Sequence, residues 1–133
     1  MHKKKVSIVA DLSTFVQSKE GVPFLWGYND CCCFAADWVA LRTGVDPMEN
    51  LRGLTSEFSA LRRLQSLGGV IPAVSSFLGE TVAKPAVGSV VLYKGVAGSQ
   101  TLGVCLGERC VLPGLDGPVF VESNLVSAAW LVC

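Results

Sequence analysis

Apolar residues recur at helical spacing through the first part of the chain, as far as Gly79. Repeats at i, i+3 and i+4 predict helices over residues 6–18, 30–42, 56–67 and 71–78. The second helix is expected to carry its apolar face on Phe34, Ala35, Trp38, Val39 and Leu41. Gly44 follows this helix and predicts its C-terminal end.

Beyond Gly79 the pattern changes to short β-prone runs that glycine and proline separate. These runs lie at residues 81–83, 89–93, 101–106, 109–112, 119–122 and 129–132. Helices followed by a small antiparallel sheet predict an α+β fold. We expect a single domain over residues 6–133, with a helical part at 6–79 and a β-rich part at 80–133, after a flexible basic segment at residues 1–5.

Composition narrows the classes of function. Half of the 133 residues are hydrophobic, 17% are charged, and the formal net charge is zero. Without a basic field, the charge pattern does not favour nucleic-acid binding. A low charge with a high apolar content fits either a compact, well-buried domain or a subunit that covers part of its surface in an assembly. No apolar run is long enough to span a bilayer, so membrane insertion is not expected.

The six cysteines do not indicate a secreted disulfide scaffold. The apolar run at residues 6–10 is interrupted by Ser7 and followed by Asp11, which makes it too short for the core of a signal peptide. The thiols are therefore expected to be made and kept reduced in a cytoplasm. Cys32, Cys33 and Cys105 are expected to serve as small core residues.

Cys31 differs from the other cysteines because it follows a predicted N-cap. The carboxylate of Asp30 can accept from the free amides of the first helical turn, which places Cys31 within that turn. Free amides and the positive end of the helix dipole lower the pKa of a thiol there. Papain-type nucleophiles occupy this position. Cys31 is thus either a retained motif thiol or a buried apolar residue.

The run Trp26-Gly27-x-x-Asp30-Cys31-x-x-Phe34 resembles the nucleophile motif of NlpC-type cell-wall endopeptidases, a papain-like family. More closely, nearly the whole chain is similar to a small domain family of unknown function from the tail gene clusters of tailed phages and prophages. The shared features are the Phe34-Ala35-Ala36-Asp37-Trp38 run, the Thr43-Gly44-x-Asp46-Pro47 turn, Arg52-Gly53, Gly68-Gly69 and a strand over residues 102–107. The resemblance implies a papain-like (NlpC-type) α+β fold, with the N-terminal helices packed on a small antiparallel sheet.

The resemblance also implies a catalytic base that this sequence lacks. In NlpC-type enzymes a histidine opens a strand, and the matching position here is Thr101, which cannot act as a general base near neutral pH. The single histidine, His2, lies in the basic N-terminal segment. The next strand, residues 109–112, offers no His, Asn or Gln to orient a base, and the usual Gly-Asp step before a strand is Gly88-Ser89. Cys31 is then a vestigial nucleophile, or one that lacks a base in this chain.

Three carboxylates, those of Asp30, Asp37 and Glu122, are alternative bases. Asp30 is better explained as the helix cap, and the helical spacing turns Asp37 away from Cys31. Trp26, Gly27 and Asp30 remain as a candidate binding loop, with Trp26 the one tryptophan expected to act as a surface anchor.

Metal and nucleotide sites have little support in the sequence. Zinc sites use paired cysteines or histidines, whereas Cys31, Cys32 and Cys33 are contiguous and only Cys105 and Cys110 have a suitable separation. The Gly95-x-x-Gly98 run lacks the Lys-Ser/Thr of a phosphate-binding loop. No metal and no cofactor are therefore expected.

The resemblance implies a structural or assembly subunit of a bacteriophage tail, in the tail tip or baseplate region, on a scaffold that has lost peptidase chemistry. Its partners would be other tail proteins, of the tip, hub or distal tail, and its location the virion after synthesis in the host cytoplasm. The rival hypothesis is a cysteine peptidoglycan endopeptidase that helps DNA pass into the cell, with Cys31 as nucleophile and a base from a partner chain. A tail-assembly chaperone absent from the particle is a third hypothesis.

Overall fold

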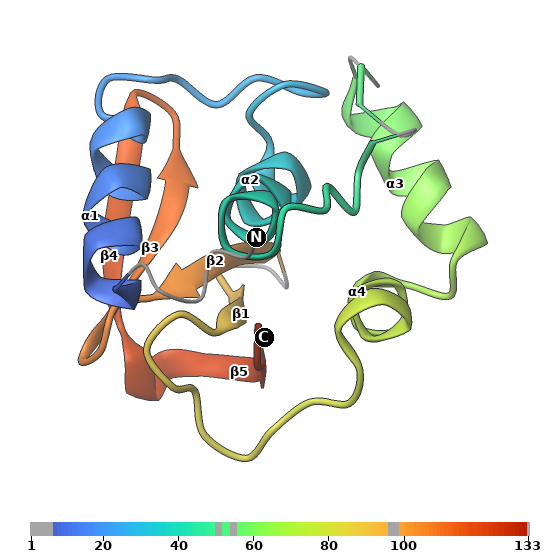
Figure 1. The fold of residues 1–133 in the computed structure, drawn as a ribbon. Helices are drawn as coiled ribbons and strands as arrows, with labels where there is room; N and C mark the ends of the chain where they lie inside the picture. Colours follow the sequence, from blue (N-terminus) through green and yellow to red (C-terminus); the bar gives the residue numbers. More distant parts are fainter. Residues whose placement is uncertain (1–6, 50–51, 54–55, 96–98, 133) are drawn as a thin grey trace.

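The computed structural model describes residues 7–49, 52–53, 56–95 and 99–132. The basic N-terminal segment with His2, and Cys133, lie outside the described residues. Within these residues the helices come first: α1 (Ile8–Lys19), α2 (Cys31–Thr43), α3 (Glu57–Ser66) and α4 (Val70–Leu78). The strands and a short 3-10 helix follow: β1 (Val90–Lys94), β2 (Gln100–Cys105), β3 (Arg109–Gly114), β4 (Gly117–Glu122), η3 (Ser123–Leu125) and β5 (Val126–Trp130) (Figure 1). This order confirms the predicted α+β class.

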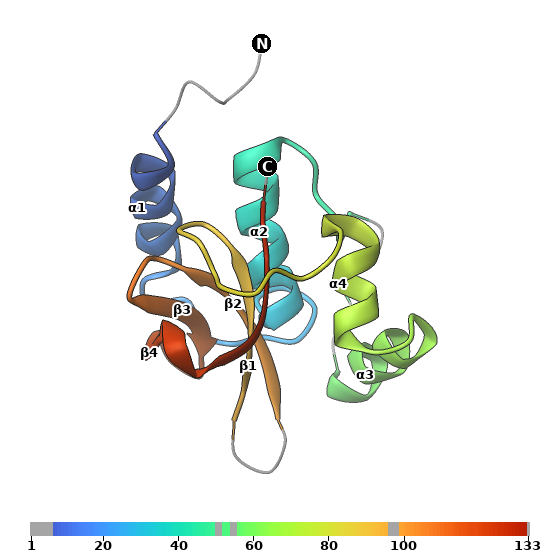
Figure 2. The same ribbon diagram turned by 90° about the horizontal axis from the view of Figure 1, so that it is seen from below.

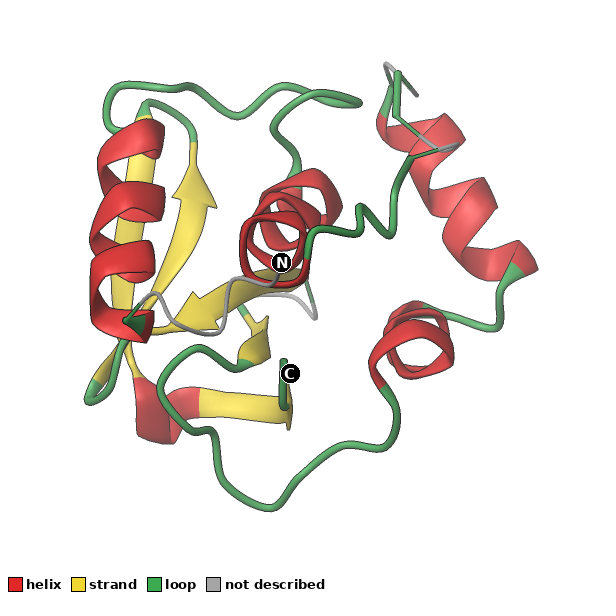
Figure 3. Cartoon of the chain, in the orientation of Figure 1, coloured by secondary structure: helices red, strands yellow, loops and turns green. Residues whose placement is uncertain are grey.

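The strands, which are yellow in Figure 3, form an antiparallel sheet in the order β4-β3-β2-β1-β5. The prediction of a strand over residues 81–83 is wrong. There, the backbone N–H of Val82 donates to the carbonyl of Ala129 at 2.9 Å, but the segment runs past β5 without forming a ladder. The last strand begins at Val126, earlier than the apolar run alone predicts.

Local sequence explains where the helices begin and end. The side chains of Ser7, Asp30 and Ser56 accept hydrogen bonds from first-turn backbone N–H groups and N-cap α1, α2 and α3. The last turn of α2 is followed by Gly44 at φ +82°, in the left-handed region that favours glycine. The predicted cap at Asp30 and the predicted end at Gly44 are both confirmed.

The sheet has two unequal faces, because side chains alternate along each strand. One face lies beneath α1 and α2 and meets their buried side chains in the main core. Its strand residues in that core are Val90, Leu92, Leu102, Val104, Val111 and Trp130. The opposite face carries a smaller cluster of Val91, Cys105, Cys110 and Ala129. Trp38 of α2 is completely buried in the main core, which for a side chain of this size contributes roughly 2–3 kcal/mol.

The α3–α4 pair lies beside α2, on the side away from α1 (Figure 2). Val70, Val74 and Leu78 of α4 are partly buried against the main core. Ser75 of α4 accepts a hydrogen bond from the indole Nε1 of Trp130 at 2.9 Å, which ties this helix to β5. Among the described residues, every helix is too short or too polar to cross a bilayer.

Candidate functional site

Cys31 occupies the first position of α2, directly after the Asp30 cap. Oδ1 of Asp30 accepts from the backbone N–H of Cys33 at 2.9 Å, and Oδ2 accepts from the backbone N–H of Gly27 at 2.8 Å. The buried carboxylate therefore fixes both the first turn of α2 and the loop that leads into it. Because each oxygen of Asp30 already accepts a backbone hydrogen bond, this residue serves as a structural cap and is poorly placed to act as a base.

Cys31, Cys32 and Cys33 differ in pKa because their surroundings differ. A side-chain hydrogen bond with Cys32 and a backbone hydrogen bond from Leu102 lower the pKa of the Cys31 thiol, although burial and the Asp30 carboxylate oppose this. The hydrogen bond with Cys31 and burial raise the pKa of Cys32. Burial raises the pKa of Cys33 to about 12. Cys31 is thus the thiol of the three that is best suited to react as a thiolate.

The pleat of β2 determines which side chains face this thiol. Leu102 and Val104 belong to the main core beneath α2, and Leu102 contacts Cys31 through its backbone. Since neighbouring residues point to opposite faces, Thr101 projects from the other face, beside its cross-strand partner Tyr93. The residue that β2 presents to α2 at this level is therefore the aliphatic Leu102, which offers neither an acid nor a base.

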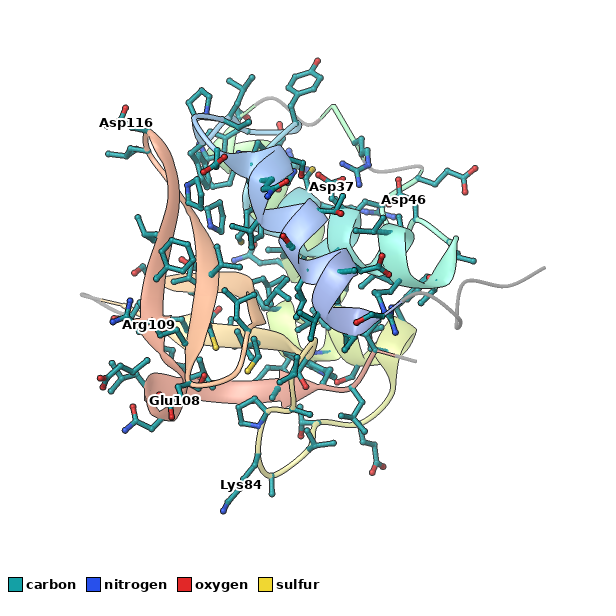
Figure 4. All side chains as sticks on the ribbon, turned by 60° about the vertical axis from the view of Figure 1, so that its left-hand side comes forward. Asp37, Asp46, Lys84, Glu108, Arg109 and Asp116 are labelled. Atoms are coloured by element: carbon teal, nitrogen blue, oxygen red, sulfur yellow. The ribbon has the colours of Figure 1, made fainter. Side chains whose placement is uncertain are left out.

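The other polar residues of the motif form an ion-pair network on the side of α2 that faces away from Cys31. Asp37 accepts from Nζ of Lys19 at 2.5 Å through Oδ2 and from Nη2 of Arg52 at 2.8 Å through Oδ1. The Arg52 guanidinium also binds both carboxylate oxygens of Asp46, which lowers the pKa of Asp46. Asp37 and Asp46 lie on the same side of the molecule (Figure 4). Asp37 therefore binds Lys19 and Arg52 and faces away from Cys31, as its helical spacing predicts.

Lys19 is buried at the end of α1, which is unusual for a lysine. Its Nζ also donates to Oδ1 of Asn29 at 3.3 Å and lies over the rings of Phe15 and Phe34. The Asn29 amide in turn donates to the carbonyl of Pro23 at 3.0 Å. Lys19 and Asn29 thus join α1 to the loop before α2, a role that no local sequence pattern signals.

Backbone hydrogen bonds connect the loop before α2 to two other segments. The carbonyl of Gly27 accepts from the backbone N–H of Gly53 at 2.9 Å, which connects it to the segment after α2. The backbone N–H of Phe24 donates to the carbonyls of Gly114 and Leu115, at 3.1 and 3.3 Å, in the β3–β4 turn. Trp26, the predicted surface anchor, is half-buried, with its ring edge-on to that of Phe24 at 4.8 Å.

This construction leaves apolar side chains in solvent beside the motif. Leu25, Tyr28 and Leu115, here called the apolar rim, are 55%, 59% and 82% exposed. The loop and the β3–β4 turn that carry them are hydrogen-bonded to each other through Phe24. Exposed apolar patches are typical of surfaces that bind another protein. Sequence reasoning missed Leu115, since a leucine between Gly114 and Asp116 reads as an ordinary turn residue.

Within the part of the chain that the structure describes, no group of three or more His, Cys, Asp or Glu side chains could hold a metal ion. Glu122, a carboxylate considered as a base, is exposed at the end of β4 and pairs in register with Arg109 of β3. It lies on a strand separated from β2 by β3, so it is not part of the Cys31 surroundings.

The sequence matches a family described as Domain of unknown function (DUF6950) over residues 4–132. No curated protein sequence matches the chain. Because the family match spans nearly the whole length, the chain belongs to this family.

Proposed function

We propose that this member of the family is a structural or assembly subunit of a bacteriophage tail, in the tail tip or baseplate region. It would be built on a degenerate papain-like (NlpC-type) scaffold without a catalytic histidine. Its partners would be neighbouring tail proteins and its location the virion. Two features support the scaffold part of the proposal: the motif cysteine begins a helix, and that helix packs on an antiparallel sheet that follows it in the chain.

The observation that carries the proposal is the way in which the motif's polar side chains are used. Asp30 caps α2 and holds Gly27, while Asp37 and Asp46 both accept hydrogen bonds from Arg52. The neighbour that β2 offers to Cys31 is Leu102, and the single histidine of the chain is His2. The motif therefore maintains a rigid loop rather than a proton-transfer pair, and a rigid loop with an apolar rim suits a binding role.

One observation favours the enzyme hypothesis. The lowered pKa of Cys31 and its place at a helix N-terminus are what a cysteine nucleophile needs. A cysteine peptidoglycan endopeptidase would still require a base to take up the thiol proton and to protonate the leaving amine. In that hypothesis a partner chain supplies the base, and the site works only in the assembled particle.

A complementation experiment separates the two hypotheses. Phage particles are prepared from a strain in which the gene is deleted and then supplied in trans as wild type, Cys31→Ala or Cys32→Ala. Under the structural proposal both variants restore tailed, infectious particles, and mass spectrometry of purified particles detects the chain at a fixed ratio to other tail proteins. If Cys31→Ala alone yields complete but non-infectious particles, the enzyme hypothesis replaces ours. Full rescue with particles that lack the chain would point to an assembly chaperone.

The apolar rim provides a second test of the binding role. Leu115→Lys places a charge in the rim, whereas Val9→Lys places one at another exposed apolar site, on α1, where the side chain is 67% exposed. We expect Leu115→Lys to reduce incorporation into particles and Val9→Lys to leave it unchanged, with both variants folded by circular dichroism. Equal incorporation of the two variants would show that the apolar rim does not bind a neighbouring tail protein.

A further inference from the structure

We propose that Cys105 and Cys110 form a reversible cross-strand disulfide when the protein meets an oxidising environment. The two residues are directly opposite in the β2–β3 ladder and belong to the small cluster on the sheet face away from α2. This inference is independent of the proposed function.

The backbone hydrogen bonds identify the type of pair that the two cysteines form. The N–H of Cys105 donates to the carbonyl of Ser89, and its carbonyl accepts from the N–H of Gly88, both at 2.8 Å. Both backbone groups of Cys105 therefore point toward the β1 side and away from β3. The N–H of the next residue, Leu106, donates to the carbonyl of Arg109 at 2.8 Å. Cys105 and Cys110 are thus a non-hydrogen-bonded antiparallel pair.

This kind of pair suits a disulfide. Opposite Cα atoms in non-hydrogen-bonded pairs lie about 4.5 Å apart, with their side chains close together. Disulfides join Cα atoms about 4.4–6.8 Å apart, so the bond can form without a change of register. In the structure both thiols are free. The backbone at Cys105 and Cys110 is therefore compatible with a disulfide between them.

The hydroxyl of Ser123 contacts both thiols. Its Oγ is 3.4 Å from Sγ of Cys110 and 3.6 Å from Sγ of Cys105, and it donates to the carbonyl of Gly107. The N–H of Ser123 also donates to the carbonyl of Glu108 at 2.9 Å. Two hydrogen bonds thus hold the start of η3 against the β2–β3 turn, and Ser123 hydrogen-bonds the reduced pair.

A groove lies beside Ser123, the residue that covers the buried pair. This groove, of about 390 Å³, lies between the segment at residues 82–85 and the surface of η3 and β5, and Ser123 is part of its lining. Lys84, which lines the groove, lies toward the same end of the molecule as Glu108 of the β2–β3 turn (Figure 4). Local opening of η3 would admit a small oxidant to thiols that are otherwise buried.

The oxidant is a low-molecular-weight disulfide, and the chemistry is thiol–disulfide exchange. One cysteine, as its thiolate, attacks a sulfur of the small disulfide, which releases one small thiol and leaves a mixed disulfide on the protein. The second cysteine loses its proton and attacks the protein sulfur of that mixed disulfide, which releases the second small thiol. The two cysteines are oxidised by two electrons in total, and the small disulfide is reduced to two thiols.

Peptide mapping tests the proposal on the intact, folded chain. The protein is treated with glutathione disulfide, free thiols are blocked with N-ethylmaleimide, and the chain is denatured and digested without reduction. Trypsin cuts after Arg109, between the two cysteines, and a protease specific for glutamate cuts after Glu122, which separates Cys110 from Cys133. A Cys105–Cys110 disulfide therefore appears as two linked peptides that reduction releases.

We expect this linked product to be about tenfold or more in excess over any other disulfide, because the pair is held at high effective concentration. The same treatment in denaturant is the control, and there the links should distribute among the six cysteines. Cys105→Ser should remove the linked product and leave the other cysteines unlinked. Glutathione adducts without a Cys105–Cys110 link in the folded wild type would overturn the proposal, whether or not the variant folds.

Discussion

Arg52 and Asp37 form an ion pair, with Nη2 of the guanidinium 2.8 Å from Oδ1 of the carboxylate. The pair joins the segment after α2 to the middle of that helix, and the same guanidinium grips Asp46 with two further hydrogen bonds. Since Asp37 also binds Lys19 at the end of α1, one carboxylate connects three segments that are far apart in sequence. These motif residues therefore hold the three segments together.

Asp30→Ala is expected to destabilise the protein by about 2–3 kcal/mol. The substitution removes the cap of α2 and leaves the buried N–H of Gly27 without its acceptor. Urea denaturation followed by tryptophan fluorescence measures the loss. Asp116→Ala, at an exposed site in the β3–β4 turn, is the matched control and should change stability little. A similar loss in both variants would contradict the role assigned to Asp30.

The Arg52–Asp46 pair should make stability depend on pH in the acid range. Arg52 lowers the pKa of Asp46 in the folded protein, so the folded state binds its proton less readily than the unfolded chain does. The stabilisation is therefore fully present above the ordinary aspartate pKa of about 3.9 and is lost as the pH falls through the lower folded value.

The stabilisation from the Arg52–Asp46 pair should be at most about 1 kcal/mol, because the pair is partly exposed. Urea midpoints measured from neutral pH down into this range should fall more steeply for the wild type than for Asp46→Asn, which has no proton to gain. Parallel curves for the two proteins would show that the pair contributes nothing.

The three contiguous cysteines should differ in their reaction with iodoacetamide. At neutral pH the folded protein should be alkylated first at Cys31, whose pKa is lowered, while Cys33, with a pKa of about 12 and no exposed surface, should be protected. Mass spectrometry of the digested protein gives the rate at each site. In denaturant the rates should become alike. Slow alkylation of Cys31 in the folded protein would mean that the motif thiol survives only as a packing residue.

Ser75→Ala should cost about 1–2 kcal/mol, although Ser75 is only half-buried. The hydroxyl is the acceptor for the indole N–H of Trp130, which is completely buried and would lose its partner. Ser76→Ala, on the next position of the same helix, removes an exposed hydroxyl that donates to the carbonyl of Ala73. Thermal unfolding of the pair of variants isolates the contribution of the Trp130 bond, and equal melting temperatures would refute it.

Local signals in the sequence predict the helices, the cap at Asp30 and the end at Gly44, because each depends on a few neighbouring residues. The burial of Trp38 follows from helical spacing for the same reason. Features that depend on contacts between distant segments could not be predicted. The pleat of β2, which turns Leu102 rather than Thr101 toward α2, depends on which face of the sheet the helices cover.

The pairing of Cys105 with Cys110 likewise depends on the register of two strands, which the turn between them determines. The number of residues between the two cysteines can be read from the sequence, but their position opposite each other in the sheet cannot. The burial of Lys19 could not be predicted either, since its partners Asn29 and Asp37 come from other segments of the chain. The papain-like assignment of the α+β fold stays a prediction, as do the phage-tail function and its partners.

The position of β5 has a consequence for the protein's behaviour at high concentration. β1 is buried on both faces, with Val90, Val91 and Leu92 almost without exposed surface, and β5 covers one of its two edges. Strands of this composition, with an open edge, readily add a strand from another molecule. Loss of the chain beyond Val126 would uncover this edge and turn β1 into a template for edge-to-edge aggregation. The last strand therefore protects the molecule against self-association as well as completing its core.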